Sequence, residues 1–177
     1  MAKPIVPNPA LLAVDTNVLM DLADGNETVL DCLATIRKKL PKSVIIVPPT
    51  VIQELATIYH EGETKLAQEL AYKALIGIRG KWGFQPINCV PVGHGIVEET
   101  ARKIRAKGLV PEEEVHDSFV IAESALANAT LLISNDSHIK DIDQQLLGEV
   151  LERCDVAKLI VCSPRKIVSH FFGSSRR

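Results

Sequence analysis

The sequence predicts an α/β fold, a single domain in three layers with helices on both faces of a central, mostly parallel sheet. Short apolar runs rich in Leu, Ile and Val occur at residues 11–14, 44–47, 131–134 and 159–162, as expected of strands buried on both faces. The segments between these runs are long enough for helices and carry apolar residues at helical spacing. Strands that alternate with helices in this way favour a parallel sheet.

The domain organisation follows from the absence of any break in the pattern. No linker, repeat or low-complexity segment divides the 177 residues, so we expect one domain over residues 1–177, a natural size for one hydrophobic core. Its core is expected to span about residues 11–172. The segment 61–92 fits the scheme least well, and we expect it to be an insertion or a hairpin that contacts a second subunit.

The first half of the chain is expected to contain helices at about residues 17–23, 27–40, 50–60 and 65–78. Residues 24–26 (Asp-Gly-Asn) separate the first two helices because they favour a turn, and Pro41 ends the second helix. Thr50 is a suitable cap for the third helix, since its hydroxyl can accept a hydrogen bond from a backbone N–H of the first turn. Residues 79–86 are predicted to form a loop.

The second half is expected to contain a short strand at 88–92 and helices at about residues 97–107, 111–128, 139–153 and 164–173. Pro111 and the three glutamates after it are typical of a first helical turn, where proline fits and carboxylates complement the helix dipole. Ser163 followed by Pro164 predicts the start of the last helix for the same reason.

Composition excludes several classes of protein. Hydrophobic residues make up 46% and charged residues 24% of the chain, which is typical of a globular protein, and no run of eighteen apolar residues predicts a membrane span. The four cysteines are scattered, which argues against a structural zinc site or a disulfide framework and favours the cytoplasm. A net charge of −2 gives no overall basic signature for nucleic acid.

Four acidic residues are expected to meet at one edge of the sheet. Asp15 follows the first strand, and Asp136 follows the strand at 131–134. Glu54 lies about one turn into the helix after the second strand, and Asp117 lies near the start of the helix before strand 131–134. Because functional sites of parallel sheets lie at the carboxyl ends of the strands, we expect all four side chains on one rim.

Each of these acids also has an ordinary structural interpretation. Asp15 can cap the following helix and Asp136 can belong to a turn, while Glu54 and Asp117 can be surface charges. Their convergence favours a metal site, because four carboxylates on one rim repel one another unless a cation lies between them. Oxygen-only ligation suits Mg²⁺ or Mn²⁺, and a set of four without Cys or His disfavours zinc.

The residues around these acids resemble the motifs of PIN-domain nucleases. The resemblance rests on Leu12-Ala13-Val14-Asp15-Thr16-Asn17-Val18-Leu19, on Glu54 within residues 49–55, on His116-Asp117-Ser118-Phe119-Val120-Ile121-Ala122, on Leu131-Leu132-Ile133-Ser134-Asn135-Asp136 and on residues 160–166. The family usually has Thr or Ser two residues before its fourth acid, and Ser134 stands there. The motifs occur in the family's order and cover about residues 11–172.

The resemblance implies a metal-dependent ribonuclease that hydrolyses a phosphodiester bond of single-stranded RNA. Carried over to this chain, it implies that Asp15, Glu54, Asp117 and Asp136 hold one or two Mg²⁺ or Mn²⁺ ions. Asn17 and Ser134 are then expected to support the site by hydrogen bonds. The resemblance further implies a toxin of a bacterial toxin–antitoxin pair, with an antitoxin protein as partner, or else a stand-alone nuclease of the family.

Two other functions fit parts of the pattern. A haloacid-dehalogenase-like phosphatase also places an Asp after its first strand, but it needs a second Asp two residues later, where this chain has Asn17. A PIN fold that binds RNA or assembles with other proteins without catalysis is the second alternative. Loss of one or more acids usually marks such proteins, and all four acids are present here.

Further residues have a functional and a structural interpretation. Trp82 and Phe84 near basic residues are able to stack on bases, or they pack in the core or a dimer contact. His116 and His138 adjoin the acids in sequence and are expected to be supporting or surface residues. Apolar residues on the helices at 65–78 and 97–107 predict a homodimer contact, unless the segment 61–92 folds back over them: Leu66, Leu70, Leu75, Ile78, Ile96, Val97 and Ile104.

Overall fold

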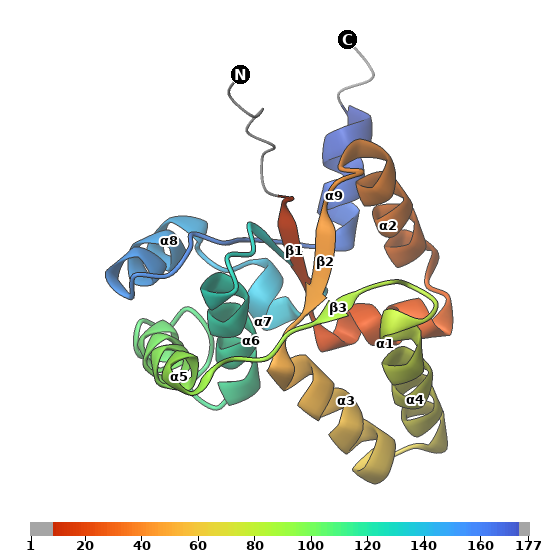
Figure 1. The fold of residues 1–177 in the computed structure, drawn as a ribbon, viewed down its shortest axis with the longest axis horizontal. Helices are drawn as coiled ribbons and strands as arrows, with labels where there is room; N and C mark the ends of the chain where they lie inside the picture. Colours follow the sequence, from red (N-terminus) through yellow and green to blue (C-terminus); the bar gives the residue numbers. More distant parts are fainter. Residues whose placement is uncertain (1–8, 174–177) are drawn as a thin grey trace, which may run out of the picture.

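The computed structural model describes residues 9–173 and confirms the predicted α/β/α fold class (Figure 1). Within these described residues, five strands form one sheet in the order β3-β2-β1-β4-β5, and every neighbouring pair is parallel. The strands are β1 (Leu11–Val14), β2 (Val44–Val47), β3 (Gln85–Pro86), β4 (Leu131–Ile133) and β5 (Ile160–Cys162).

Helices flank this sheet and connect its strands. They are α1 (Thr16–Asp24), α2 (Glu27–Lys39), α3 (Pro49–Glu61), α4 (Lys65–Arg79), α5 (Pro91–Ala106), α6 (Val115–Leu126), α7 (Ser137–Lys140), α8 (Gln144–Arg153) and α9 (Pro164–Gly173). The helix α2 packs against α9, α5 packs against α6, and α3 contacts both α4 and α6. Within residues 9–173, no helix is long and apolar enough to cross a membrane.

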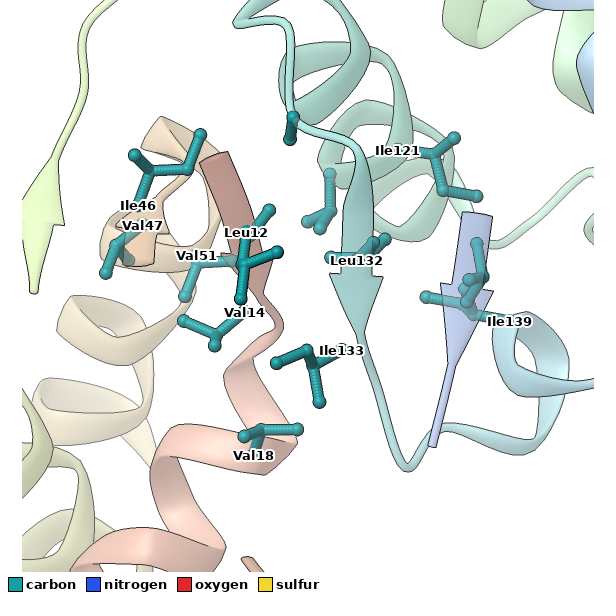
Figure 2. Packing of buried hydrophobic residues seen from close by; sticks show 14 of the residues in the cluster. Leu12, Val14, Val18, Ile46, Val47, Val51, Ile121, Leu132, Ile133 and Ile139 are labelled. Atoms are coloured by element: carbon teal, nitrogen blue, oxygen red, sulfur yellow. The ribbon is translucent and has the colours of Figure 1, made fainter. Parts of the chain in front are cut away.

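The interior strands β1 and β4 contribute fully buried residues to the core (Figure 2). Leu12 and Val14 of β1 and Leu132 and Ile133 of β4 are at most 2% exposed. Val14 pairs with Ile133 at the carboxyl ends of these strands, and the N–H of Asp15 donates to the carbonyl of Ile133 at 3.1 Å. The residues that directly follow the two strands are therefore brought side by side. In Figure 1, β1 and β2 run downward and lead into α1 and α3 at this same edge.

One predicted strand is wrong. The edge strand β3 lies at Gln85–Pro86, and the predicted strand 88–92 is instead a loop followed by the first turn of α5, which begins at Pro91. Proline fits the first position of a helix, where no intrahelical partner exists for a backbone N–H. The apolar run that suggested a strand faces outward, since Val90 is 69% and Val92 is 77% exposed.

Several helix starts also differ from the prediction, and α5 begins at Pro91 rather than at about residue 97. The helix α6 begins at Val115, because residues 111–114 form a turn in which the N–H of Glu114 donates to the carbonyl of Pro111 at 3.1 Å. The predicted helix 139–153 is divided into α7 and α8, since Asp143 accepts two backbone N–H groups and caps α8. Thr50 is not a cap: it lies inside α3, whose cap position is occupied by Pro48.

The segment 61–92 supplies the end of α3, all of α4 and the strand β3. Its residues Trp82 and Phe84 pack inward. Phe84 is 4% exposed, and the ring of Trp82 lies 5.9 Å from the ring of Phe84. Trp82 also covers Gly77 so closely that a Cβ there would lie 2.9 Å from its ring. These contacts support the core interpretation of both aromatic residues rather than base stacking.

Candidate functional site

Asp15 is the most enclosed of the four predicted carboxylates, with 5% of the residue exposed. Its Oδ1 accepts a hydrogen bond from the N–H of Thr16 at 2.7 Å, which makes it the N-cap of α1. Its Oδ2 accepts from Ser134 Oγ at 2.6 Å and from Asn17 Nδ2 at 3.3 Å. The capping role therefore fixes the carboxylate at the carboxyl edge of the sheet, so the two interpretations of Asp15 are compatible.

Ser134 connects Asp15 to the acid that follows β4. The fully buried Ser134 hydroxyl donates to Asp15 and accepts from the N–H of Asp136 at 3.0 Å. Asn17 crosses the same gap, since its Oδ1 accepts from the N–H of Asn135 at 3.1 Å. Both predicted supporting residues thus tie the start of α1 to the loop after β4.

Glu54 reaches the rim from α3. The hydroxyl of Thr16 donates a hydrogen bond to Glu54 Oε2, and Glu54 Oε1 lies 3.1 Å from Nδ1 of His116. The Glu54 side chain is 23% exposed, whereas that of His116 is 69% exposed. Glu54 is therefore not a free surface acid. Thr16 has no predicted role, although its position directly after Asp15 indicates that it lies at the same edge of the sheet.

Asp117 lies in the first turn of α6, and its Oδ2 is buried without a hydrogen-bond partner. Nδ1 of His138 lies 3.9 Å from that oxygen, 3.7 Å from Asp136 Oδ1 and 3.6 Å from Glu114 Oε1. Among the described residues, Glu114, Asp117 and His138 form a group of three whose potential ligand atoms all lie within 4.8 Å of one another.

That compact group differs from the predicted set of four acids. Glu114 is predicted in the first turn of a helix, and His138 is predicted as a supporting or surface residue. In the sequence, only their spacing from the acids indicates that they lie near the rim, since Glu114 precedes Asp117 by three residues and His138 follows Asp136 by two. The turn at 111–114 and the short helix α7 bring both side chains to the rim.

Burial and repulsion raise the pKa of Asp15. The value rises to about 6, chiefly because burial disfavours the charged carboxylate. Hydrogen bonds from Ser134 and Thr16 act in the opposite direction, and the charges of Glu54 and Asp136 add to the rise. The carboxylate is thus held by donors but lies in a negative environment.

The pKa of Asp117 rises further, to about 7. Burial is again the largest cause, followed by the negative charges of Asp136, Asp15, Glu114 and Glu54. Within residues 9–173, no Lys or Arg nitrogen lies within 4.0 Å of the four predicted carboxylates, and their ion-pair neighbours are His116 and His138. The structure therefore brings the four acids into one electrostatically coupled rim whose negative charge lacks a strong basic partner.

A hollow of about 300 Å³ adjoins this rim on the side of α3. It is lined by Thr50, Gln53, Glu54, Thr57, Ile58 and His116. The Glu54 carboxylate thus borders a space that a bound molecule can enter from solvent.

Comparisons with known proteins identify a family for this arrangement. A family model for the PIN domain matches residues 12–145, which include all four predicted acids. No curated protein matches the sequence. Among solved structures, the crystal structure of VapBC2 from Rickettsia felis bound to a DNA fragment from their promoter contains a similar chain, with a TM-score of 0.57 and 15% identity. The likeness covers 86% of this chain and 98% of that chain, and it shows the fold.

The raised pKa values predict that the metal-free protein loses stability as the pH rises. A carboxyl group with a higher pKa in the folded than in the unfolded chain stabilises the fold at low pH, and this stabilisation disappears as the pH rises through the folded value. For Asp15 and Asp117 that window runs from the ordinary value of 3.8 to about 7. We expect a higher melting temperature in EDTA at pH 5 than at pH 8, measured by circular dichroism.

Asp117→Asn should weaken this pH dependence and stabilise the metal-free protein at pH 8 by about 1–3 kcal/mol, because the neutral amide removes a buried charge and its repulsion from the neighbouring carboxylates. Glu112→Gln, at an exposed position in the same segment, is the matched control and should leave the dependence unchanged. If the melting temperatures of the parent and of Asp117→Asn change equally between pH 5 and pH 8, Asp117 is not the source of the pH dependence of stability.

Proposed function

This chain belongs to the PIN-domain family, and we propose that it is a divalent-metal-dependent endoribonuclease that hydrolyses phosphodiester bonds of single-stranded RNA. The observation that carries the proposal is the rim of coupled carboxylates, in which Oδ2 of Asp117 is buried and unpartnered. Buried acceptors normally have partners, so an unsatisfied one that faces several negative charges is a place where a cation fits.

The donor set fits Mg²⁺ or Mn²⁺. Asp15, Glu54, Asp117 and Asp136 offer the oxygen atoms that both ions accept. Nδ1 of His138, within 3.9 Å of the Asp117 and Asp136 carboxylates, adds a nitrogen donor, which favours Mn²⁺ over Mg²⁺. We propose that the acids of the rim hold the ion and that Glu114 and His138 complete its surroundings.

When bound, such an ion supplies the positive charge that offsets negative charge developing on a phosphate group and promotes attack by water. The protein's own residues keep the acceptors in place. Ser134 and Asn17 donate to the carboxylate of Asp15, and Thr16 donates to that of Glu54. These bonds hold the side chains before any ion binds, which limits the reorganisation that binding requires.

Cleavage of a labelled single-stranded RNA with Mn²⁺ tests the proposal directly. Asp15→Asn keeps a similar side-chain shape but removes a charge, and we expect it to lower the cleavage rate by about 10- to 100-fold or more, since even residues that only support a metal ligand cost that much. Asp31→Asn, at an exposed position on α2, should cleave like the parent.

The other outcomes separate the alternatives. RNA binding without cleavage, unchanged in Asp15→Asn, would favour a catalytically silent RNA-binding protein. Cleavage in EDTA at the same rate as in Mn²⁺ would contradict metal dependence. Release of phosphate from a simple monoester with no action on RNA would favour the phosphatase alternative.

We further propose that the chain is the toxin of a toxin–antitoxin pair and forms a homodimer. The fold likeness to a chain of the VapBC2 structure supports the toxin proposal, and the presence of an antitoxin gene beside this one would test it.

Exposed apolar side chains on α4 support the homodimer, since Leu66 is 60% and Ile76 is 59% exposed. Tyr72 of α4 and Tyr59 of α3 add to this surface, with ring centres 5.4 Å apart. Three residues of the predicted dimer patch are instead in the core: Ile78, Val97 and Ile104.

Sedimentation at micromolar concentration tests the homodimer. We expect the parent to sediment as a dimer and Ile76→Glu to sediment as a monomer, because a charge is costly to bury in an apolar contact. Leu30→Glu changes a residue on α2 that is 46% exposed and should remain dimeric. A monomeric parent at every concentration would rule out the dimer without affecting the proposed nuclease activity.

A further inference from the structure

A buried glutamate outside the predicted site joins two of its helices. Glu123 of α6 is 6% exposed and Thr50 of α3 is 5% exposed. Glu123 Oε2 accepts a hydrogen bond from the N–H of Thr50 at 3.0 Å, and Oε1 accepts one from the Thr50 hydroxyl at 2.8 Å. Both carboxylate oxygens are thus engaged by one residue that lies 73 positions away in the sequence.

The contact replaces a local helix cap. The cap position of α3 is Pro48, which makes no side-chain hydrogen bond to the helix. Glu123 supplies the missing acceptor to the second residue of the helix, where an N-cap side chain normally binds, and its charge lies at the positive end of the helix dipole. Burial raises the pKa of Glu123, while the Thr50 hydrogen bonds and the neighbouring His94 act in the opposite direction.

The position of this contact relates it to the rim of acids. Thr50 lies four residues, or about one helical turn, before Glu54 on α3, and Glu123 lies six residues after Asp117 on α6. One short link therefore connects the two helices that each contribute a carboxylate to the rim. Along an α-helix, a shift at Thr50 is transmitted to Glu54, because the intervening turn is hydrogen-bonded and packed.

We propose that Glu123 is a positioning residue of the nuclease site, whose buried bidentate contact with Thr50 holds α3 against α6 and so sets the placement of Glu54 relative to Asp117. The proposal rests on the proposed metal-dependent function. It differs from a purely structural role in what it predicts: loss of the contact weakens metal binding in protein that is still folded, beyond any change in melting temperature.

The experiment measures Mn²⁺ affinity by calorimetry at a temperature well below the melting point of each variant. Glu123→Gln keeps the size of the side chain but presents one acceptor and one donor to two donor groups of Thr50. We expect its affinity for Mn²⁺ to fall by about 10- to 100-fold, as for other residues that orient metal ligands, with a parallel loss of RNA cleavage.

Two substitutions of Thr50 keep the test valid if Glu123→Gln does not fold. Thr50→Val removes only the hydroxyl contact and should lower the Mn²⁺ affinity by a smaller factor than Glu123→Gln. Thr50→Ser retains both donor groups and should bind Mn²⁺ like the parent.

The matched control is Ser124→Ala on the same helix. The buried hydroxyl of Ser124 bonds only to the carbonyl of Val120, within α6, so its loss is expected to lower the melting temperature without changing Mn²⁺ affinity. Parent-like affinity in Glu123→Gln and Thr50→Val, with the parent binding Mn²⁺ and cleaving RNA, would overturn the positioning role and leave the proposed function intact. A parent that neither binds Mn²⁺ nor cleaves RNA would overturn both.

Discussion

Several carboxylates that share one rim at the end of a buried sheet repel one another, and the surrounding structure is organised around that repulsion. Hydrogen-bond donors partly offset this repulsion: Ser134 donates to Asp15, Thr16 donates to Glu54, and a backbone N–H donates to Asp136. The Oδ2 atom of Asp117 receives none. The rim is thus a set of fixed acceptors with unbalanced negative charge, and this arrangement supports the proposed binding of a divalent cation.

The fold fixes the backbone positions from which the four acidic side chains reach the rim. Parallel pairing of Val14 with Ile133 aligns the ends of β1 and β4, which places the acids that follow them in register. The other two acids come from helices, whose placement relative to each other is less constrained than that of hydrogen-bonded strands. The buried contact between Glu123 and Thr50 supplies a specific constraint between these helices. Stability provided by the apolar core offsets the local cost of the rim, as is common at functional sites.

Much of this arrangement was predictable because it follows from local pattern. The apolar strands and the acids at their ends could be placed from the sequence, since the end of a strand fixes where the next residue lies. Features that depend on contacts between distant segments could not. Thr50 has the local pattern of a cap, but its partner is on another helix. The placement of Glu114 and His138 beside Asp117 depends on the turn at 111–114 and on the short helix α7. The apolar run at 88–92 resembled a strand although its valines face outward.

The central claim is that this rim binds a divalent cation, and anomalous X-ray scattering from crystals grown with Mn²⁺ at neutral pH tests it most directly. We predict a strong peak bounded by the carboxylate of Asp117 and at least one of Asp15 and Asp136, with metal–oxygen distances of about 2.0–2.6 Å. Crystals of Asp117→Asn grown under the same conditions should lack that peak. The account would be contradicted if crystals at saturating Mn²⁺ showed no anomalous peak at the rim, or showed peaks only at carboxylates elsewhere on the surface.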